Sequence, residues 1–181
     1  MPVNTASKTA FVLAGGGSLG AVEVGMLRAL AAVGLRPDLI VGASAGAING
    51  AHFAADPTPA GVAKLEQVWR GITRRDVMPL GLRDLLRIAW RREFMVDPSG
   101  LRRLLEKHIA YQRLEEAAVP MHVVATDRLL GSEVLLSSGS VVDAVLASTA
   151  IPGVFPPVCI DGRDLIDGGV ANNTPISTAI R

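Results

Sequence analysis

The chain has 181 residues, of which 49% are hydrophobic and 19% are charged, and its formal net charge is +1. This composition excludes a disordered chain and suits one globular domain with its own core. The near-neutral charge gives no electrostatic reason to expect a nucleic acid as partner, and no apolar run approaches the ~20 residues of a membrane helix.

The N-terminus and the single cysteine indicate the compartment. Residues 1–8 contain no apolar stretch behind a basic region, so we expect no signal peptide. Cys159 excludes an intramolecular disulfide and fits a reducing compartment; its apolar neighbours predict a place in the core. We therefore expect a cytoplasmic protein whose contact with lipid, where it occurs, is peripheral.

The predicted elements alternate between strands and helices, which is typical of a layered α/β fold. Strands are expected at 9–14, 38–41, 121–126 and 133–136, followed by a hairpin of 158–160 and 163–166 around Asp161-Gly162. Helices are expected at 21–33, 47–54, 58–72, 82–94, 99–110 and 140–150, the last capped by Ser140. The apolar face expected for the first helix consists of Val22, Met26, Leu27, Leu30 and Val33.

The end of the chain is unusual for a complete domain. Thr174-Pro175 has the pattern of an N-cap and a first helical residue, yet only six residues follow. A helix of that length is marginal alone. We expect residues 1–181 to form a single domain that is incomplete at its C-terminus.

A glycine-rich loop follows the first predicted strand. Gly15-Gly16-Gly17 can direct backbone N–H groups into a cleft, which acyl transfer requires where negative charge develops on a carbonyl oxygen. The spacing Gly15-x-Gly17-x-x-Gly20 also matches a dinucleotide-binding fingerprint. That fingerprint needs an acid at the end of the second strand, whereas Asp38 begins its strand.

A serine lies between glycines where the second predicted strand turns into a helix. The motif Gly42-x-Ser44-x-Gly46 is typical of a nucleophile elbow, in which a tight turn exposes the serine hydroxyl at the end of a sheet. The following helix directs its N-terminal amides and positive dipole end toward the same point. Ser44 is therefore the candidate nucleophile.

An aspartate ends the last predicted strand, in Asp167-Gly168-Gly169. A carboxylate at a strand end, followed by two flexible residues, can reach a neighbouring catalytic turn. Asp161 is the competing carboxylate, but its position before Gly162 favours a hairpin turn.

The histidines are poorly placed to act as bases. His52 lies two turns into the helix after Ser44, and His108 lies near a helix end, where it suits a capping or surface role. His122 starts a strand and is predicted to be a hydrogen-bonded core residue. A conventional α/β-hydrolase places its histidine last in the chain order of its triad, and no histidine follows residue 122.

Together, the motifs Gly15 to Gly20, Gly42 to Gly46 and Asp167 to Gly169 resemble the patatin-like phospholipase family in its bacterial type. The run 147–157 also resembles the family's loop before the aspartate. The resemblance spans residues 9–175 and implies a three-layer α/β fold with a central, mostly parallel sheet flanked by helices. The family often has Arg or Lys where this sequence has Leu19, so no cation is expected beside the glycine loop.

The resemblance also implies a reaction. It suggests a lipid acyl hydrolase that cleaves carboxylic esters of lipids with a Ser44–Asp167 dyad through an acyl-enzyme, without a metal or cofactor. The implied oxyanion donors are the amides of Gly15, Gly16, Gly17 and Ala45. Burial of Asp167 among Leu165, Ile166 and Val170 would raise its pKa and make it a better base.

Residues 82–94 carry an arginine stripe, Arg83, Arg87 and Arg91, opposite apolar residues that include Trp90. Basic amphipathic helices of this kind bind anionic membrane surfaces, although a solvated helix that packs its leucines on the core has the same pattern. Two other functions stay open, a conventional α/β-hydrolase esterase with a Ser-His-Asp triad and a catalytically silent binding module. The sequence leaves the oligomeric state open.

Overall fold

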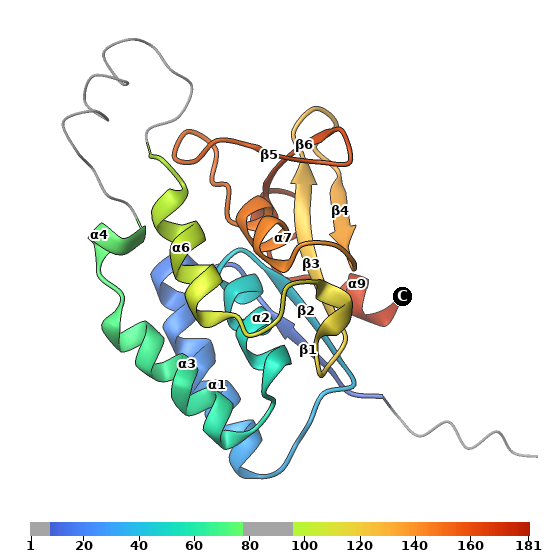
Figure 1. Cartoon of the computed structure of the whole chain (residues 1–181). Coiled ribbons are helices and arrows are strands. Elements are labelled where there is room, and N and C mark those ends of the chain that lie inside the picture. Colours follow the sequence, from blue (N-terminus) through green and yellow to red (C-terminus); the bar gives the residue numbers. More distant parts are fainter. Residues whose placement is uncertain (1–7, 78–95) are drawn as a thin grey trace, which may run out of the picture.

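The computed structural model describes residues 8–77 and 96–181, so the expected helix at 82–94 lies outside the described residues. The described part is an α/β structure whose helices pack on a mixed sheet (Figure 1). The strands are β1 (Ala10–Leu13), β2 (Leu39–Ala43), β3 (Met121–Asp127), β4 (Glu133–Leu136), β5 (Val158–Ile160) and β6 (Arg163–Asp167). The helices are α1 (Gly20–Ala32), α2 (Ala45–Ala55), α3 (Pro59–Gly71), α4 (Arg74–Val77), α6 (Ser99–His108), α7 (Val141–Ser148), α8 (Gly169–Asn172) and α9 (Ile176–Ile180), with short 3-10 turns at Gly17–Leu19 and Leu114–Glu116.

The sheet contains both parallel and antiparallel pairs. β1, β2 and β3 are parallel neighbours, whereas β4 and β6 pair antiparallel with β3. β5 pairs antiparallel with β6 and so runs in the same direction as β3. Of the six strands in the described residues, four share one direction, which confirms the predicted mostly parallel sheet flanked by helices.

Both edges of β3 are occupied, and one of them is divided between two strands. Val123 and Val124 pair with β2 and also with β4, while Ala125 and Thr126 pair with β4 and also with β6. β2 and β6 therefore lie on the same edge of β3, opposite β4. β2 ends opposite Val124, and β6, which runs the other way, ends opposite Ala125. The carboxyl ends of β2 and β6 thus meet at one point beside β3.

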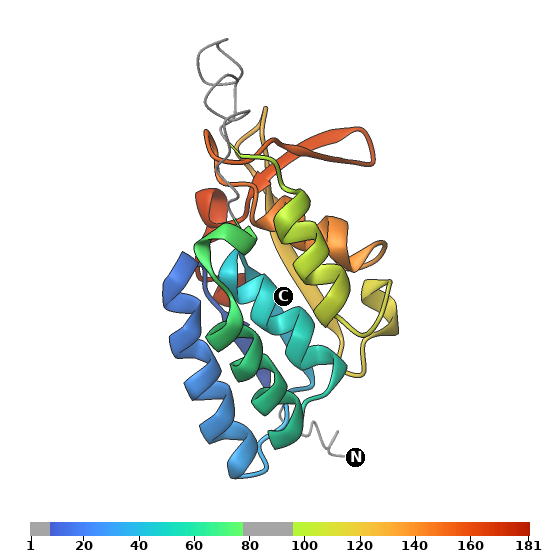
Figure 2. The same ribbon diagram turned by 60° about the vertical axis from the view of Figure 1, so that its left-hand side comes forward.

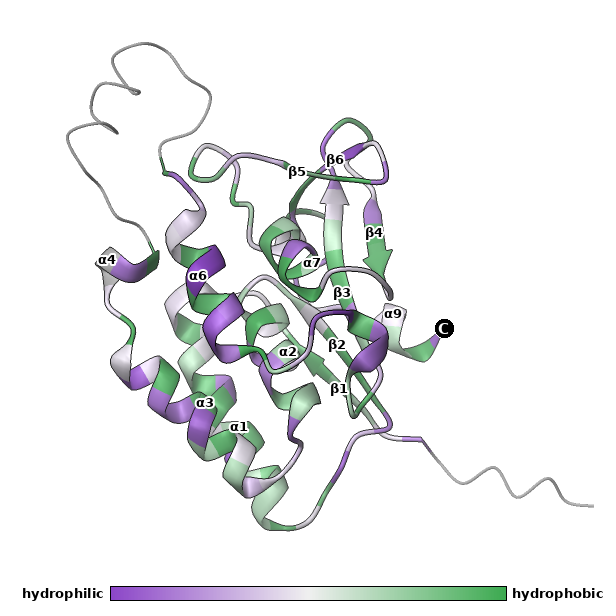
Figure 3. Ribbon diagram, in the orientation of Figure 1, coloured by the Kyte–Doolittle hydropathy of each residue, from purple (hydrophilic) through white to green (hydrophobic). Residues whose placement is uncertain are grey.

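The two faces of the sheet are covered unequally. On one face α2 and α7 pack on the strands, and α1, α3 and α6 surround them; Figure 2 shows this side with the sheet behind the helices. The outer helices α3 and α6 carry many hydrophilic residues (Figure 3). On the opposite face Val41, Ala43 and Val124 form a smaller cluster with Ala179 of α9.

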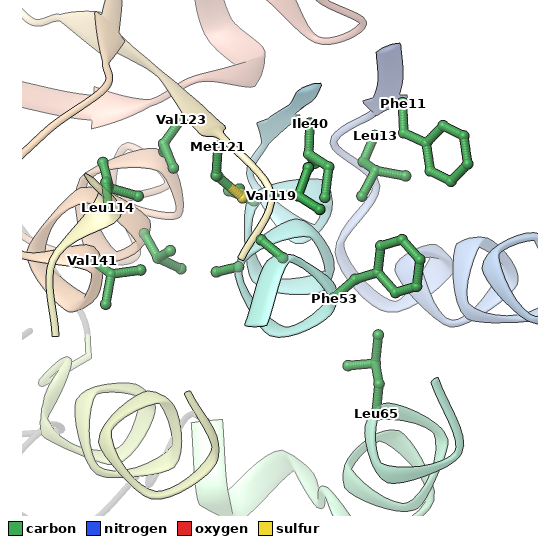
Figure 4. Close-up of a cluster of buried hydrophobic side chains, with 14 of the residues drawn as sticks. Phe11, Leu13, Ile40, Phe53, Leu65, Leu114, Val119, Met121, Val123 and Val141 are labelled. Carbon is green, nitrogen blue, oxygen red and sulfur yellow. The ribbon is translucent and has the colours of Figure 1, made fainter. Parts of the chain in front are cut away.

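The main hydrophobic core lies between the sheet and α2. Figure 4 shows Ile40, Met121 and Val123 from the strands facing the helices. The rings of Phe11 and Phe53 are stacked, with centroids 6.1 Å apart. Because burial of a large apolar side chain contributes about 1.5–3 kcal/mol, this core fixes α2, and with it the loop before α2, on the sheet.

The predicted apolar face of α1 is wrong in part. Leu27 is buried, but Val22, Met26 and Val33 are 63%, 60% and 78% exposed. The face that packs inward is formed by Gly20, Val24, Leu27 and Ala31. Two of these residues, Gly20 and Ala31, are small, which lets α1 approach its neighbours closely, and Val22, Met26 and Val33 lie on the outer side of the helix.

The last part of the chain differs from the expectations at Cys159 and at the start of the final helix. Cys159 is exposed, not in the core, because side chains alternate along a strand and those of Val158 and Ile160 face the apolar cluster instead. The predicted hairpin is confirmed, with positive φ values of 50° and 75° at Asp161 and Gly162. The prediction of Thr174 as N-cap and Pro175 as first helical residue is wrong by one position, because the final helix begins at Ile176 with Pro175 as its N-cap.

Candidate active site

The meeting point of β2 and β6 brings the two main candidate residues together. Ser44 directly follows β2, and Asp167 is the last residue of β6. The Ser44 hydroxyl donates a hydrogen bond to Asp167 Oδ2 at 2.7 Å, and both residues are buried. A serine hydroxyl bonded to a carboxylate is the arrangement from which the carboxylate can accept the proton.

Ser44 occupies a strained turn between β2 and α2. Its φ of 51° and ψ of −120° are rare for a residue with a side chain and cost about 1–3 kcal/mol. The flanking glycines allow the close packing of this turn: a β-carbon on Gly46 would lie 2.2 Å from the Leu13 carbonyl oxygen, and one on Gly42 would lie 2.6 Å from the Gly46 carbonyl oxygen. The N-terminus of α2, which is the positive end of the helix dipole, lies at this turn.

The environment of Asp167 raises its pKa. Burial is the largest cause, and the hydrogen bonds that the Ser44 hydroxyl and the Gly169 amide donate to the carboxylate lower the pKa in opposition. The Gly169 N–H donates to Oδ1 at 2.7 Å, so each carboxylate oxygen accepts one bond. Val170 was expected to help bury this group, but its side chain is 57% exposed, because α8 turns it toward solvent.

The glycine loop lies against the turn that holds Ser44. A β-carbon on Gly15 would lie 3.2 Å from the Ser44 β-carbon and 2.3 Å from Asn173 Oδ1. The Gly15 N–H donates to the Asn173 carbonyl at 3.0 Å, so this amide, one of the four predicted oxyanion donors, already has a hydrogen-bond partner in the structure. The Gly16 and Gly17 amides have no hydrogen-bond partner within the described part of the chain.

The amide of Ala45 completes the predicted set of donors. Ala45 is the first residue of α2, where backbone N–H groups have no partner inside the helix. Among the described residues none accepts a hydrogen bond from it. The structure thus leaves the amides of Gly16, Gly17 and Ala45 available.

A partly buried polar network links the glycine loop to α2. The Glu23 carboxylate accepts the Ala14 N–H at 2.7 Å and the Asn49 side-chain amide at 2.9 Å. Asn49 also donates to the Gly20 carbonyl and accepts the Trp69 indole N–H at 2.7 Å. Burial, the largest cause, raises the pKa of Glu23, and the bonds from Asn49 and Ala14 lower it in opposition.

The histidines lie elsewhere. His52 and His108 line a cavity of about 660 Å³ between α3 and α6, and Ser44 is not among the residues that line it. His122 lies within β3 opposite Val41. It was expected to be hydrogen-bonded, but its buried Nδ1 has no partner among the described residues. In the same residues no histidine is hydrogen-bonded to Ser44 or Asp167.

The remaining predicted features lie outside the Ser44–Asp167 contact. Asp161 is in the β5–β6 turn, and the Leu19 side chain is 70% exposed beside the glycine loop. In the described ranges no three or more His, Cys, Asp or Glu side chains group as metal ligands would. The described helices also include none with the length and hydropathy of a membrane span.

Sequence reasoning missed residues that shape the site without carrying a motif. Asn173 binds the backbone of Gly15 from the end of α8, and Ser148 contacts the Ser44 backbone from the end of α7. Asn49 offered a signal, because it is a polar residue in the middle of the mostly apolar helix α2.

Comparison with known proteins identifies the family. Residues 11–180 match the family described as Patatin-like phospholipase. The chain therefore belongs to the patatin-like phospholipase family. Relatives include Patatin-like phospholipase domain-containing protein 7 of Rattus norvegicus, 30% identical over 177 residues, and Patatin-like phospholipase domain-containing protein 6 of Homo sapiens, 30% identical over 179 residues.

The chain spans only part of these relatives. The matches cover 97% and 98% of this chain but 13% of each relative. Neuropathy target esterase sws of Drosophila sechellia is 28% identical over 173 residues, which cover 94% of this chain and 11% of that protein. The solved structure of VipD from Legionella pneumophila superposes with a TM-score of 0.63 at 16% identity, covering 93% of this chain and 47% of that chain, and so supports the fold.

Proposed function

We propose that the protein is a lipid acyl hydrolase that cleaves carboxylic esters with Ser44 as nucleophile and Asp167 as base. The observation that carries the proposal is the 2.7 Å hydrogen bond from the Ser44 hydroxyl to the Asp167 carboxylate. The family is described as phospholipases, and one relative is named an esterase. These names support an ester of a lipid as the substrate.

The first half of the reaction forms an acyl-enzyme. Asp167 takes the hydroxyl proton while Ser44 Oγ forms a bond to the ester carbonyl carbon, and the carbonyl oxygen becomes an oxyanion. Amides of Gly16, Gly17 and Ala45 stabilise that charge. The oxyanion then re-forms the carbonyl, the bond to the alcohol oxygen breaks, and Asp167 returns its proton to the departing alcohol.

The second half releases the acid. Asp167 takes a proton from a water molecule, which attacks the acyl carbon, and the collapse of this intermediate returns the proton to Ser44. The raised pKa of Asp167, caused by burial, makes it a stronger base than an exposed aspartate. One residue with a tuned pKa thus takes and returns the proton in both halves of the reaction.

Exposed apolar side chains next to the site support a lipid substrate. Leu19, 70% exposed, ends the turn after the glycine loop, and Val170, 57% exposed, follows Asp167-Gly168-Gly169. Side chains of this kind favour contact with acyl chains or with the surface of a lipid aggregate. Membrane binding by residues 82–94 is a prediction from the sequence alone.

A covalent probe tests the proposal directly. A fluorophosphonate should modify Ser44, and Ser44→Ala should lose both labelling and hydrolysis across a panel of esters graded from short chains to phospholipids. Ser18→Ala is the matched control, because Ser18 is an exposed serine of the glycine loop. Full activity of Ser44→Ala would contradict the mechanism, and absence of both labelling and hydrolysis in the wild type would favour a silent binding module.

A further inference from the structure

The parallel ladder between β2 and β3 has an interrupted last rung. The Ile40 N–H donates to the Pro120 carbonyl at 2.9 Å. Because rungs of a parallel ladder recur every two residues along a strand, the same register assigns the Ser44 N–H to the Val124 carbonyl. That bond is not made directly. The Ser44 N–H donates to Ser148 Oγ at 2.8 Å, and the Ser148 hydroxyl donates to the Val124 carbonyl at 2.6 Å.

The Ser148 hydroxyl is therefore inserted between two groups that would otherwise pair. The orientation of the Ser148 hydroxyl is determined, because it donates its single proton to the Val124 carbonyl and accepts the Ser44 N–H with a lone pair. Ser148 is fully buried, and its own backbone is held in the same place. Its carbonyl accepts the Gly168 N–H at 3.1 Å, and the Ala150 carbonyl accepts the Asp167 N–H at 3.0 Å.

The end of α7 thus contacts both candidate catalytic residues through separate bonds. On one side it sets the distance of the Ser44 backbone from β3, and on the other it holds the strand end that carries Asp167. We propose that Ser148 is a positioning residue, whose hydroxyl spaces the Ser44 turn away from β3 so that Ser44 Oγ reaches Asp167. This role deepens the proposed function and rests on it.

Kinetics of Ser148→Ala provide the first test. Without the hydroxyl, the Ser44 amide either moves onto the Val124 carbonyl or loses its acceptor, and both displace Oγ. We expect kcat to fall about 10- to 100-fold, the range for a small misplacement of a reacting group, with KM within about twofold. Thr149→Val is the matched control, because among the residues that the structure describes the Thr149 hydroxyl bonds only to carbonyls of its own helix. It should retain kcat within about twofold.

A double-mutant cycle distinguishes positioning from a general loss of stability. If Ser148 acts through the Ser44–Asp167 contact, Ser148→Ala should change the rate of phosphonate labelling by no more than about twofold when Asp167 is already asparagine. An equal loss in both backgrounds would overturn the proposal, as would an unchanged kcat in the single variant. Should Ser148→Ala fail to fold, Ser148→Cys keeps the volume but bonds weakly and must show the same coupling.

A crystal structure of Ser148→Ala tests the geometry without reference to activity. The Ser44 N to Val124 O separation should shorten toward a direct bond of about 2.9 Å, and Ser44 Oγ should leave hydrogen-bonding distance of Asp167. A water molecule in place of the hydroxyl, with Ser44 unmoved, would overturn the proposal. Failure of the proposed function is recognised separately, because the wild type would then show no labelling at Ser44.

Discussion

Replacement of Asp167 by asparagine should lower activity and change the pH dependence of stability together. Loss of a general base costs about 10²- to 10⁴-fold in rate, which corresponds to about 2.7–5.4 kcal/mol of transition-state stabilisation. Because Asp167 must be ionised to accept the proton, wild-type activity should fall as the pH drops through its pKa. Burial raises that pKa, so the acid limb should lie above the range of an exposed aspartate.

The stability change follows from the same shift. The pKa of Asp167 is higher in the folded protein than in the unfolded chain, so its contribution to stability is fully present at low pH and is lost as the pH rises through the folded-state pKa. Each unit of difference corresponds to about 1.4 kcal/mol. Asparagine at position 167 removes this pH-dependent loss of stability. It also gives up one of the two hydrogen bonds that Ser44 and Gly169 donate to the carboxylate, at a cost of about 1 kcal/mol that does not depend on pH.

Thermal unfolding and ester hydrolysis, both followed from about pH 4 to about pH 8, check the two effects. The Tm of Asp167→Asn minus that of the wild type should increase with pH. Glu23, whose pKa is also raised, contributes equally to both proteins and cancels. Asp161→Asn, in the β5–β6 turn, is the control and should change neither activity nor this difference. A Tm difference that is flat or falls with pH would refute the reasoning, as would normal turnover by Asp167→Asn.

Three further predictions follow from the packing and exposure of single residues. Gly15→Ala should lower activity, since its β-carbon would lie 2.3 Å from the side-chain amide oxygen of Asn173. The control Gly25→Ala, in open space on α1, should retain activity and gain about 0.5–1 kcal/mol of stability. Equal activity of the two variants would contradict this prediction. Asn49→Ala should cost about 1–3 kcal/mol in chemical denaturation and alter the fluorescence of Trp69, its indole donor; an unchanged spectrum would argue against that bond. Cys159 should react with a maleimide in the native state, because it is exposed; slow reaction would indicate that it is covered.

The order of elements and the choice of Ser44 and Asp167 as candidates could be predicted from local patterns, whereas the pairing of these two residues followed from the resemblance to the family. A serine between glycines after a strand, and an aspartate at a strand end, are recognisable within a few residues. The hairpin at Asp161-Gly162 was predicted for the same reason, since positive φ values suit these residue types.

What could not be predicted depends on contacts between distant segments. The spacing of apolar residues in α1 shows that a face is buried, but close packing against its neighbours selected the side with Gly20 and Ala31. The bonded state of the Gly15 amide depends on Asn173, whose role no local pattern indicates. Ser148 belongs to the same class, because its function exists only where β2 and β6 meet beside β3.

Formation of the site also depends on complete folding of the chain. The bonds Ser44–Asp167, Ser44–Ser148 and Gly15–Asn173 join residues separated by 123, 104 and 158 positions in the chain. Closing such long loops costs entropy that local contacts do not repay, so we expect these bonds to form late in folding. A partly folded chain with native helices should therefore lack the Ser44–Asp167 contact. On refolding, ester hydrolysis should return later than the helical signal in circular dichroism. The contacts around Ser44 are complete only when the loop after β1 and the segments that carry Ser148, Asp167 and Asn173 have come together.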